Sequence, residues 1–217
     1  MEEAYGEKIR VEYHHYPLSF HKFAEGSAIA SMAAHKQGKF FEMVDKLYAD
    51  TKKQDRKTLE KYAGELGLDV AQFKKDLSDK DLIRYVRMDA KAGEKLEVSG
   101  TPTMFLNGRK LNARDLAGFK AEIDTELAAI EKLTTAGDSV TVARKKRILA
   151  AANGVAYLDF VVEGKEIEVD TAPPKAPAPP KPKPVDKTVF NAVVNPGDPV
   201  KGPLDALVTI VECSDFQ

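Results

Sequence analysis

The segment that most constrains the fold is residues 206–213, "ALVTIVEC", a run rich in apolar and β-branched residues. This pattern is typical of a strand that is buried on both faces of a sheet. A second strand-like run, "TVFNAVV" at 188–194, precedes it across the turn-rich residues 195–205. Because two strands alone do not form a stable domain, the rest of the sheet has to come from other residues.

A stretch rich in proline and lysine separates these strands from the rest of the chain. Residues 171–187, "TAPPKAPAPPKPKPVDK", hold seven of the twelve prolines together with four lysines. This composition cannot bury a core and predicts an extended linker of the polyproline type. The lysines could instead contact an acidic surface, but we favour the linker. The 51 residues 137–187, at about 3.3 Å each when extended, would let the terminal strands fold back onto the first half.

The first half of the chain predicts a strand followed by a block of helices. Residues 8–13, "KIRVEY", alternate polar and apolar side chains as a half-buried strand does. Between Phe20 and Leu96, apolar residues recur at three- and four-residue spacing, which predicts four or five short helices. Asp55 is suited to cap one of these helices at its amino end, and Gly67 to end it.

After the helices the pattern changes to two short strands and a long helix. The sequence "TPTMFLNGRKLNA" predicts a hairpin that turns at Asn107-Gly108, because this dipeptide favours a tight turn with positive φ. An amphipathic helix is expected to run from Arg114 to Leu133. Its predicted apolar face consists of Leu116, Phe119, Ile123, Leu127 and Ile130.

Residues 134–170 give a weaker pattern. "VTVARKKRILAAANG" predicts a further helix that ends at Asn153-Gly154. "AYLDFVVEGKEIEVD" predicts a small hairpin that turns at Glu163-Gly164.

Charge and composition exclude several classes of partner. Lys and Arg number 33 against 34 Asp and Glu, so the overall field gives no reason to expect nucleic acid or an anionic membrane. No apolar run reaches the roughly 20 residues of a membrane span, and residues 1–10 do not resemble a signal peptide. The one cysteine, Cys213, excludes an internal disulfide and a multi-cysteine metal site.

Three motifs carry a resemblance to a known family: "EEAYGEKIRVEYHHYPL" at 2–18, "VSGTPTMFLNGRKLNA" at 98–113 and "KGPLDALVTIVECSDFQ" at 201–217. Together they resemble the DsbA-like thiol-disulfide oxidoreductases, which have a thioredoxin fold with a helical insertion. In that family the third motif precedes a Cys-x-x-Cys, and the second contains a cis-proline. The likeness covers residues 1–133 and 188–217.

The resemblance implies an α/β, thioredoxin-like fold in circularly permuted order. Residues 1–133 are expected to form a DsbA-type domain without its first strands and its Cys-x-x-Cys. Residues 188–217 are then the amino-terminal strands of such a domain, and strands within 188–213 complete the sheet. Strand 207–213 should lie between the strands at 8–13 and 103–106. A segment cut from tandem domains is the simplest explanation, and a deliberate circular permutation is the alternative.

The resemblance also implies a site. The family's Cys-x-x-Cys is expected directly after Gln217, so no catalytic cysteine is present. Glu212 matches the family's buried proton acceptor, although an ordinary solvent-facing carboxylate at a strand end is an equal alternative. Gly100, Thr101, Pro102 and Thr103 match the loop that binds substrate, with a cis bond between Thr101 and Pro102. No cofactor and no metal are implied.

The remaining polar and aromatic candidates are interpreted as structural. Cys213 is expected to be a buried, inert thiol. His14, His15, His21 and His35 have no carboxylate or cysteine at metal-ligand spacing, so structural or surface roles are preferred to metal binding. The cluster Phe20, Phe23, Phe40 and Phe41 is expected in the core rather than in a binding groove.

Three functions follow from this interpretation. The first is that the parent protein is an extracytoplasmic, for example periplasmic, thiol-disulfide oxidoreductase acting on cysteine-containing proteins or peptides. This chain would be its scaffold and would not reduce or form disulfides by itself. The second is a redox-silent peptide-binding or chaperone module, and the third is a structural spacer. A domain-swapped homodimer is a further possibility, because the terminal strands could complete a second copy.

Overall fold

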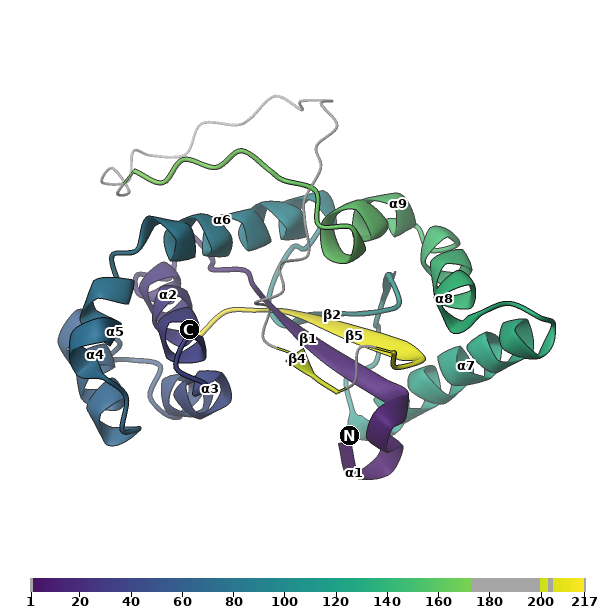
Figure 1. Ribbon diagram of the computed structural model, residues 1–217, viewed down its shortest axis with the longest axis horizontal. Coiled ribbons are helices and arrows are strands. Elements are labelled where there is room, and N and C mark those ends of the chain that lie inside the picture. Colours follow the sequence, from purple (N-terminus) through teal and green to yellow (C-terminus); the bar gives the residue numbers. More distant parts are fainter. Residues whose placement is uncertain (1, 173–199, 203–204, 217) are drawn as a thin grey trace.

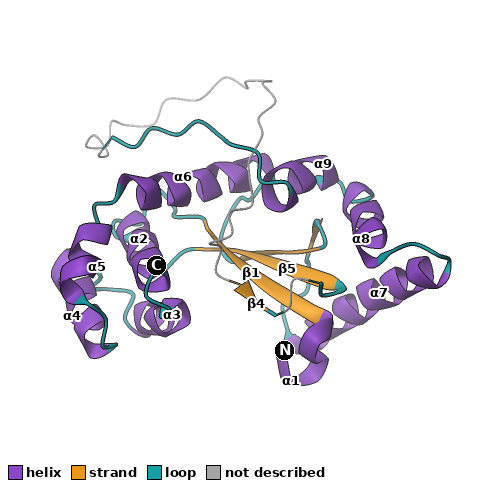
Figure 2. Cartoon of the chain, in the orientation of Figure 1, coloured by secondary structure: helices purple, strands orange, loops and turns teal. Residues whose placement is uncertain are grey.

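The computed structural model describes residues 2–172, 200–202 and 205–216. It contains mixed α and β structure (Figure 2). The helical elements are α1 Glu2–Tyr5, η1 Gly6–Lys8, α2 Ala24–His35, α3 Phe40–Ala49, α4 Arg56–Glu65, α5 Val70–Asp76, α6 Lys80–Lys95, α7 Leu116–Thr135, α8 Val140–Leu149, α9 Gly154–Tyr157 and η2 Leu158–Val162. The strands are β1 Ile9–His15, β2 Thr103–Leu106, β3 Arg109–Lys110, β4 Val200–Lys201 and β5 Val208–Ser214. The predicted strand at 188–194 lies outside the described residues.

Strand β5 lies inside the sheet, between β1 and β2 (Figure 1). The strand order is β3-β2-β5-β1-β4, and β5 is parallel to β1 and antiparallel to β2. Its register with β1 runs from Ile9↔Val208 to His15↔Ser214. The prediction that strand 207–213 pairs with the strands at 8–13 and 103–106 is therefore confirmed, and the pairing occurs within one chain.

The turn at Asn107-Gly108 joins β2 to β3 as predicted. The φ angles of Asn107 and Gly108 are 44° and 80°, the positive values that a tight hairpin turn needs. The prediction for residues 195–205 was incomplete, because Val200 and Lys201 form the short edge strand β4 against β1. A strand of two residues is too short to show an alternating pattern in the sequence. It is recognised in the structure from the pairing of Lys201 with Val11.

Five helices follow β1 and form a helical block, in which α2 to α5 lie at one end of the sheet and α6 runs from there along the sheet toward α9 (Figure 1). The predicted cap at Asp55 is confirmed, since its carboxylate accepts a hydrogen bond from the Thr58 amide, and Gly67 has φ 72° just after that helix. The core of the block also contains Tyr13 of β1 and Phe216, which follows β5. The last residues of β5 therefore tie the sheet to the helical block.

The two faces of the sheet are covered by different helices. Val208 and Ile210 pack with Ile123 of α7, whereas Val211 and Cys213 pack with residues of the segment α8 to η2. This alternation is the period of two that a strand imposes on its side chains. The apolar face of α7 is shorter than predicted, because Leu116, at the first position of the helix, is 58% exposed.

The predicted hairpin turning at Glu163-Gly164 is wrong, because residues 154–162 are helical. Helix α9 continues directly into the π-helical turn η2. Its residues Tyr157, Leu158 and Val161 are buried together against the sheet. That spacing places them on one helical face, so packing on the sheet overrides the preference of β-branched residues for strands.

A substitution at Gly154, the first residue of α9, would test whether α9 packs as described. A Cβ on Gly154 would collide with the backbone carbonyl of Ile148, so we expect Gly154→Ala to lower the free energy of unfolding by about 1–3 kcal/mol. The matched control is Gly26→Ala in helix α2, where a Cβ meets no atom within 4 Å. That variant should gain about 0.5–1 kcal/mol from helix propensity. Equal urea midpoints for the two variants would contradict the described placement of α9.

The expected phenylalanine cluster belongs only in part to the core. Phe40 is buried and Phe41 packs beside it. Phe20 is 76% exposed and stacks edge-on against the His21 ring instead, and Phe23 is only half-buried under the Lys22 ammonium group. The prediction for Phe20 is therefore wrong, because this residue lies in the loop before α2 and not on a helix face.

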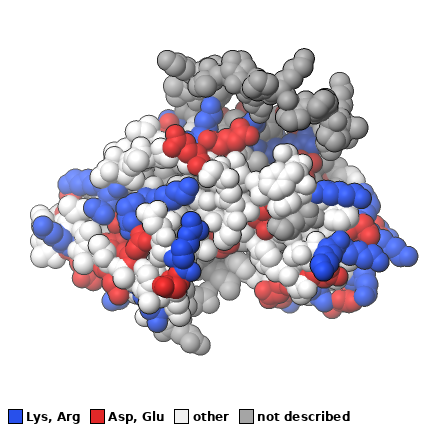
Figure 3. Space-filling view, turned by 180° about the vertical axis from the view of Figure 1, so that it is seen from behind, with Lys and Arg blue, Asp and Glu red and all other residues white. Residues whose placement is uncertain are grey.

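The described surface shows no dominance of one charge. Figure 3 shows lysines and arginines interspersed with aspartates and glutamates over one face. None of the helices in the described part of the chain has both the length and the apolar character that crossing a bilayer requires.

Candidate functional site

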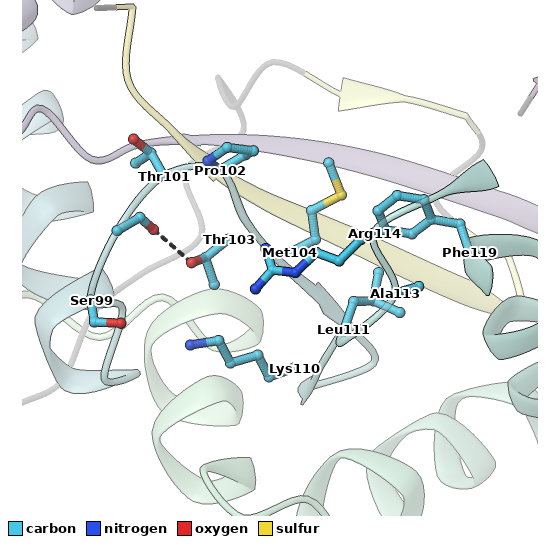
Figure 4. Close-up of a pocket in the computed structure, with 11 residues that line it drawn as sticks. Ser99, Thr101, Pro102, Thr103, Met104, Lys110, Leu111, Ala113, Arg114 and Phe119 are labelled. Atoms are coloured by element: carbon cyan, nitrogen blue, oxygen red, sulfur yellow. Dashed lines mark hydrogen bonds between the residues drawn. The ribbon is translucent and has the colours of Figure 1, made fainter.

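The loop between α6 and β2 forms one wall of a pocket of about 440 Å³ (Figure 4). The peptide bond between Thr101 and Pro102 is cis, the isomer that the resemblance implied. The Thr103 hydroxyl donates a hydrogen bond of 2.7 Å to the carbonyl oxygen of Gly100 and so closes the loop on itself. The four predicted substrate-binding residues therefore lie together at the pocket.

The opposite wall of this pocket combines apolar and cationic side chains. Met104, Leu111 and Phe119 supply the apolar surface, and Lys110 and Arg114 supply the charge. Figure 4 shows both cationic side chains extending toward Thr103. Neither cation forms an ion pair within the described residues, and the described lining contains no carboxylate. The pocket is therefore suited to a ligand with an apolar part and a negative charge.

The carboxyl end of β5 lies beside the same loop. Thr103 is the register partner of Cys213, one residue before the end of the strand. Just beyond, the Ser214 carbonyl accepts a hydrogen bond of 2.8 Å from the Tyr16 amide. The fold thus brings together the loop at Pro102, the end of β1 and the end of β5.

Asp215 is a site residue that the sequence analysis missed. Its side chain is fully buried, and Oδ2 lies 2.5 Å from His21 Nδ1 and 3.3 Å from the Leu18 amide. Its other oxygen, Oδ1, has no hydrogen-bond partner among the described residues. The only sequence signal was a turn-like Ser-Asp after a strand, because His21 is 194 positions away in the chain.

Glu212 lies in the middle of the sheet, opposite Tyr13 on one side and Met104 on the other. Burial raises the pKa of its carboxyl group, and a hydrogen bond with Ser214 works in the opposite direction. A carboxylate whose pKa is raised is a stronger proton acceptor than one at its ordinary pKa, so Glu212 is suited to exchange a proton with a neighbouring group. Its role as a proton acceptor stays a prediction.

Cys213 is buried, as predicted, with 3% of its surface exposed. Burial raises the pKa of the thiol, and the nearby carboxylates of Asp89 and Glu212 raise it further. Thiol-disulfide exchange requires an accessible thiolate. Cys213 is therefore a packing residue and cannot act as the nucleophile.

Two of the histidines have carboxylate partners that the sequence did not reveal. His14 Nδ1 lies 3.0 Å from Asp89 Oδ1, and Asp89 Oδ2 also accepts the backbone amide of His15 at 2.8 Å. His21 pairs with Asp215 as described above. Within residues 2–172, 200–202 and 205–216, no three His, Cys, Asp or Glu residues come together in a way that could hold a metal ion.

The fold and the loop at Pro102 agree with a comparison to known families. The sequence model of the thioredoxin family matches residues 1–125, more than half of the chain. The chain belongs to the thioredoxin family. The match includes β1, the helical block and the hairpin, while β5 and the segment α8 to η2 lie outside it. No solved structure matches this thioredoxin-family chain.

Three curated relatives of this thioredoxin-family chain carry the name of a transporter. The chain is 38% identical over 103 residues to the Na(+)/H(+) antiporter NhaA 3 of Salinispora tropica, which is 47% of this chain and 16% of that protein. It is 34% identical over 109 residues to the Na(+)/H(+) antiporter NhaA 1 of Mycobacterium sp. (strain KMS). These residues are 49% of this chain and 18% of that protein. The antiporter NhaA of Herminiimonas arsenicoxydans is 35% identical over 107 residues, which are 49% of this chain and 17% of that protein. The similarity thus covers less than a fifth of each relative.

Membership in the thioredoxin family is compatible with a redox or disulfide function at the level of the superfamily. The site residues are consistent with such a function in their placement, because the loop at Pro102 lies beside the end of the central strand. The chain supplies no exposed thiol at this point among its described residues.

Proposed function

We propose that this chain is the substrate-binding scaffold of a thiol-disulfide oxidoreductase of the DsbA type. The observation that supports this most directly is the pocket at Thr101 and Pro102, which lies beside the carboxyl end of β5. Its substrate would be an extended polypeptide that contains cysteine. The backbone of Thr101 would pair with the substrate as an added strand, and the apolar wall would hold a neighbouring side chain.

Such an enzyme needs two thiols next to this loop. A thiolate attacks one sulfur of a disulfide, the S–S bond breaks, and the second sulfur leaves as a thiolate; a second thiol of the enzyme then resolves the mixed disulfide. The 217 residues hold one cysteine, and it is buried. We therefore assign binding and proton transfer to this chain, with Glu212 as the proton acceptor, and expect no turnover of disulfides by the chain itself.

Several finer features belong to this proposal. The block α2 to α6 would be the DsbA-type helical insertion, and residues 188–217 would be the first strands of a domain in permuted or tandem order. An extracytoplasmic location would suit a disulfide enzyme, since disulfides persist there. A domain-swapped dimer would form if β5 paired with β1 and β2 of a second copy.

A redox-silent peptide-binding module is the second candidate function. The pocket at Pro102 is formed in a chain whose thiol is buried, and this observation favours binding without chemistry. Both candidates place the peptide in the same pocket. The third candidate function, a structural spacer, requires no ligand in the pocket at Pro102.

Blocking the pocket tests the proposal. A Cβ at Gly100 would meet no atom within 4 Å, so Gly100→Trp can fill the pocket without a clash at its base. We expect this variant to weaken the binding of an extended, acidic, cysteine-containing peptide at least about tenfold, as measured by fluorescence anisotropy, because about 1.4 kcal/mol of contact is lost. The matched control, Gly26→Trp, lies on the exposed surface of α2 and should bind as the wild type does.

The outcomes separate the candidates. Equal affinity for the wild type and Gly100→Trp would remove the pocket from the proposal. The absence of measurable binding to the wild type would favour the structural spacer. If the same chain reduced insulin with clear turnover, the assignment of binding without chemistry would be wrong.

A further inference from the structure

A second, smaller pocket lies under the segment α8 to η2, on the face of the sheet opposite to α7. It has a volume of about 180 Å³ and shares no lining residue with the pocket at Pro102. Its floor is formed by polar residues of β1 and β5, and its roof by residues from α8, α9 and η2. Polar residues at the centre of an otherwise apolar interface are costly unless their hydrogen-bonding groups are satisfied.

The charges that line this pocket do not balance. Glu12 is 2% exposed and forms an ion pair with Arg10. Arg144 of α8 forms no ion pair with a carboxylate in the described part of the chain, and its Nη2 donates a hydrogen bond of 2.6 Å to the Thr209 hydroxyl. The lining therefore carries two guanidinium groups against one carboxylate, an excess of one positive charge.

Hydrogen-bond donors are also in excess. Arg10 Nε, Arg144 Nε and the Tyr157 hydroxyl are all buried, and none has a hydrogen-bond partner among the described residues. Tyr157 is 1% exposed, so its hydroxyl group cannot turn to bulk water. A guanidinium group only donates hydrogen bonds, so two of these three groups need an acceptor that the described side chains do not supply.

The polar amide of Asn107, which also lines the pocket, is already occupied. Its nitrogen donates to Glu126 at 3.1 Å, and its oxygen accepts from the Thr209 amide at 2.9 Å. Asn107 therefore fixes the end of β5 and does not supply the missing acceptor. Burial lowers the pKa of Arg144 and the nearby charge of Arg10 lowers it further, whereas Tyr157 and Glu12 raise it; a bound anion would also raise it.

We propose that this pocket is a binding site for one small oxyanion, a carboxylate or an inorganic phosphate, held by Arg10, Arg144 and Tyr157. A carboxylate has two oxygens with about four acceptor positions, enough for all three orphaned donors, and its charge balances the lining. The ligand joins β1 to α8 and α9, so its binding couples the α8–η2 segment to the sheet.

Calorimetric titration of the full chain tests the site. The probes are sodium formate and sodium phosphate at pH 7, with sodium chloride at the same ionic strength as reference. We expect one equivalent of formate or phosphate to bind and to raise the melting temperature. Tyr157→Phe keeps the ring that packs on the sheet and removes only the donor, so binding should weaken about fivefold.

A second pair of variants separates the site from general charge effects. Arg144→Gln should weaken binding at least about tenfold, because a charge-assisted hydrogen bond is lost. Lys145→Gln removes an exposed charge from the same helix and should leave the affinity unchanged. The proposal would be overturned if the wild type and Tyr157→Phe bound the probes with equal affinity. It would also be overturned if neither formate nor phosphate bound saturably, and the pocket would then be interpreted as holding only water.

Discussion

Replacing Val211 by aspartate should unfold most of the molecule. Val211 is fully buried in the middle of β5, where Glu12 of β1 and Phe105 of β2 are its register partners. An aspartate there would lose its hydration beside the buried carboxylate of Glu12, at a cost of at least about 3 kcal/mol. Since domains of this kind have about 5–15 kcal/mol of stability, the urea midpoint should fall sharply or cooperative unfolding should disappear.

The matched control for this variant is Val142→Asp. Val142 lies on α8 and is 44% exposed, so we expect its free energy of unfolding to change by less than about 0.5 kcal/mol. Circular dichroism during urea titration measures the free energy of unfolding of both variants. If Val211→Asp unfolded at the urea concentration of the wild type, β5 would not be the central strand, and the pairing of the terminal segment with the first half of the chain would be wrong.

The second large effect is a loss of stability in acid that depends on His15. This side chain is fully buried among the rings of Tyr13, Phe40 and Phe216, and neither ring nitrogen has a hydrogen-bond partner among the described residues. Burial lowers the pKa of His15 from 6.5 to about 4. Asp89 of α6 raises this pKa, whereas His14 and His35 lower it. The folded protein therefore holds His15 neutral.

The sign of the pH dependence follows from this shift. Because the folded-state pKa lies below the unfolded one, the unfolded chain binds the proton first as the pH falls. The contribution of His15 is complete above about pH 6.5 and is lost toward about pH 4. Between pH 7.5 and 4.5 the free energy of unfolding should fall by about 2 to 3 kcal/mol through this residue alone.

Urea titrations at these two pH values measure the effect. His15→Leu should remove this part of the pH dependence and should not lose stability at pH 7.5, because an apolar side chain suits the surrounding rings. His35→Gln, a partly exposed position on α2, should keep most of the wild-type slope. A His15→Leu variant with the full wild-type slope would show that other groups cause the acid sensitivity.

Local patterns in the sequence were enough to predict many elements. The Asn107-Gly108 turn, the cap at Asp55 and the buried run at 206–213 each depend on neighbours within a few residues, so the sequence carries their signal directly. The position of β5 between β1 and β2 was predicted from the resemblance to the DsbA-like family, and the apolar run itself indicated only a strand buried on both faces.

The candidate site was predictable only in part. The loop at Thr101 and Pro102 was found because the residues are contiguous and resemble a family motif. The cations Lys110 and Arg114, which share its pocket, were not found, since an exposed cation has no periodic signal. Asp215 was missed because its partner His21 lies 194 positions away.

Tertiary packing decided the remaining features. Residues 154–162 are helical although β-branched residues suggested strands, because Tyr157, Leu158 and Val161 gain more from burial on the sheet than from their local preference. The sequence alone determined which segments are strands, turns and caps in most of the chain, since those depend on local chemistry. Only the folded structure determined which distant polar groups meet, such as Arg144 with Thr209 and His14 with Asp89, because such contacts depend on how the elements pack and not on their order in the chain.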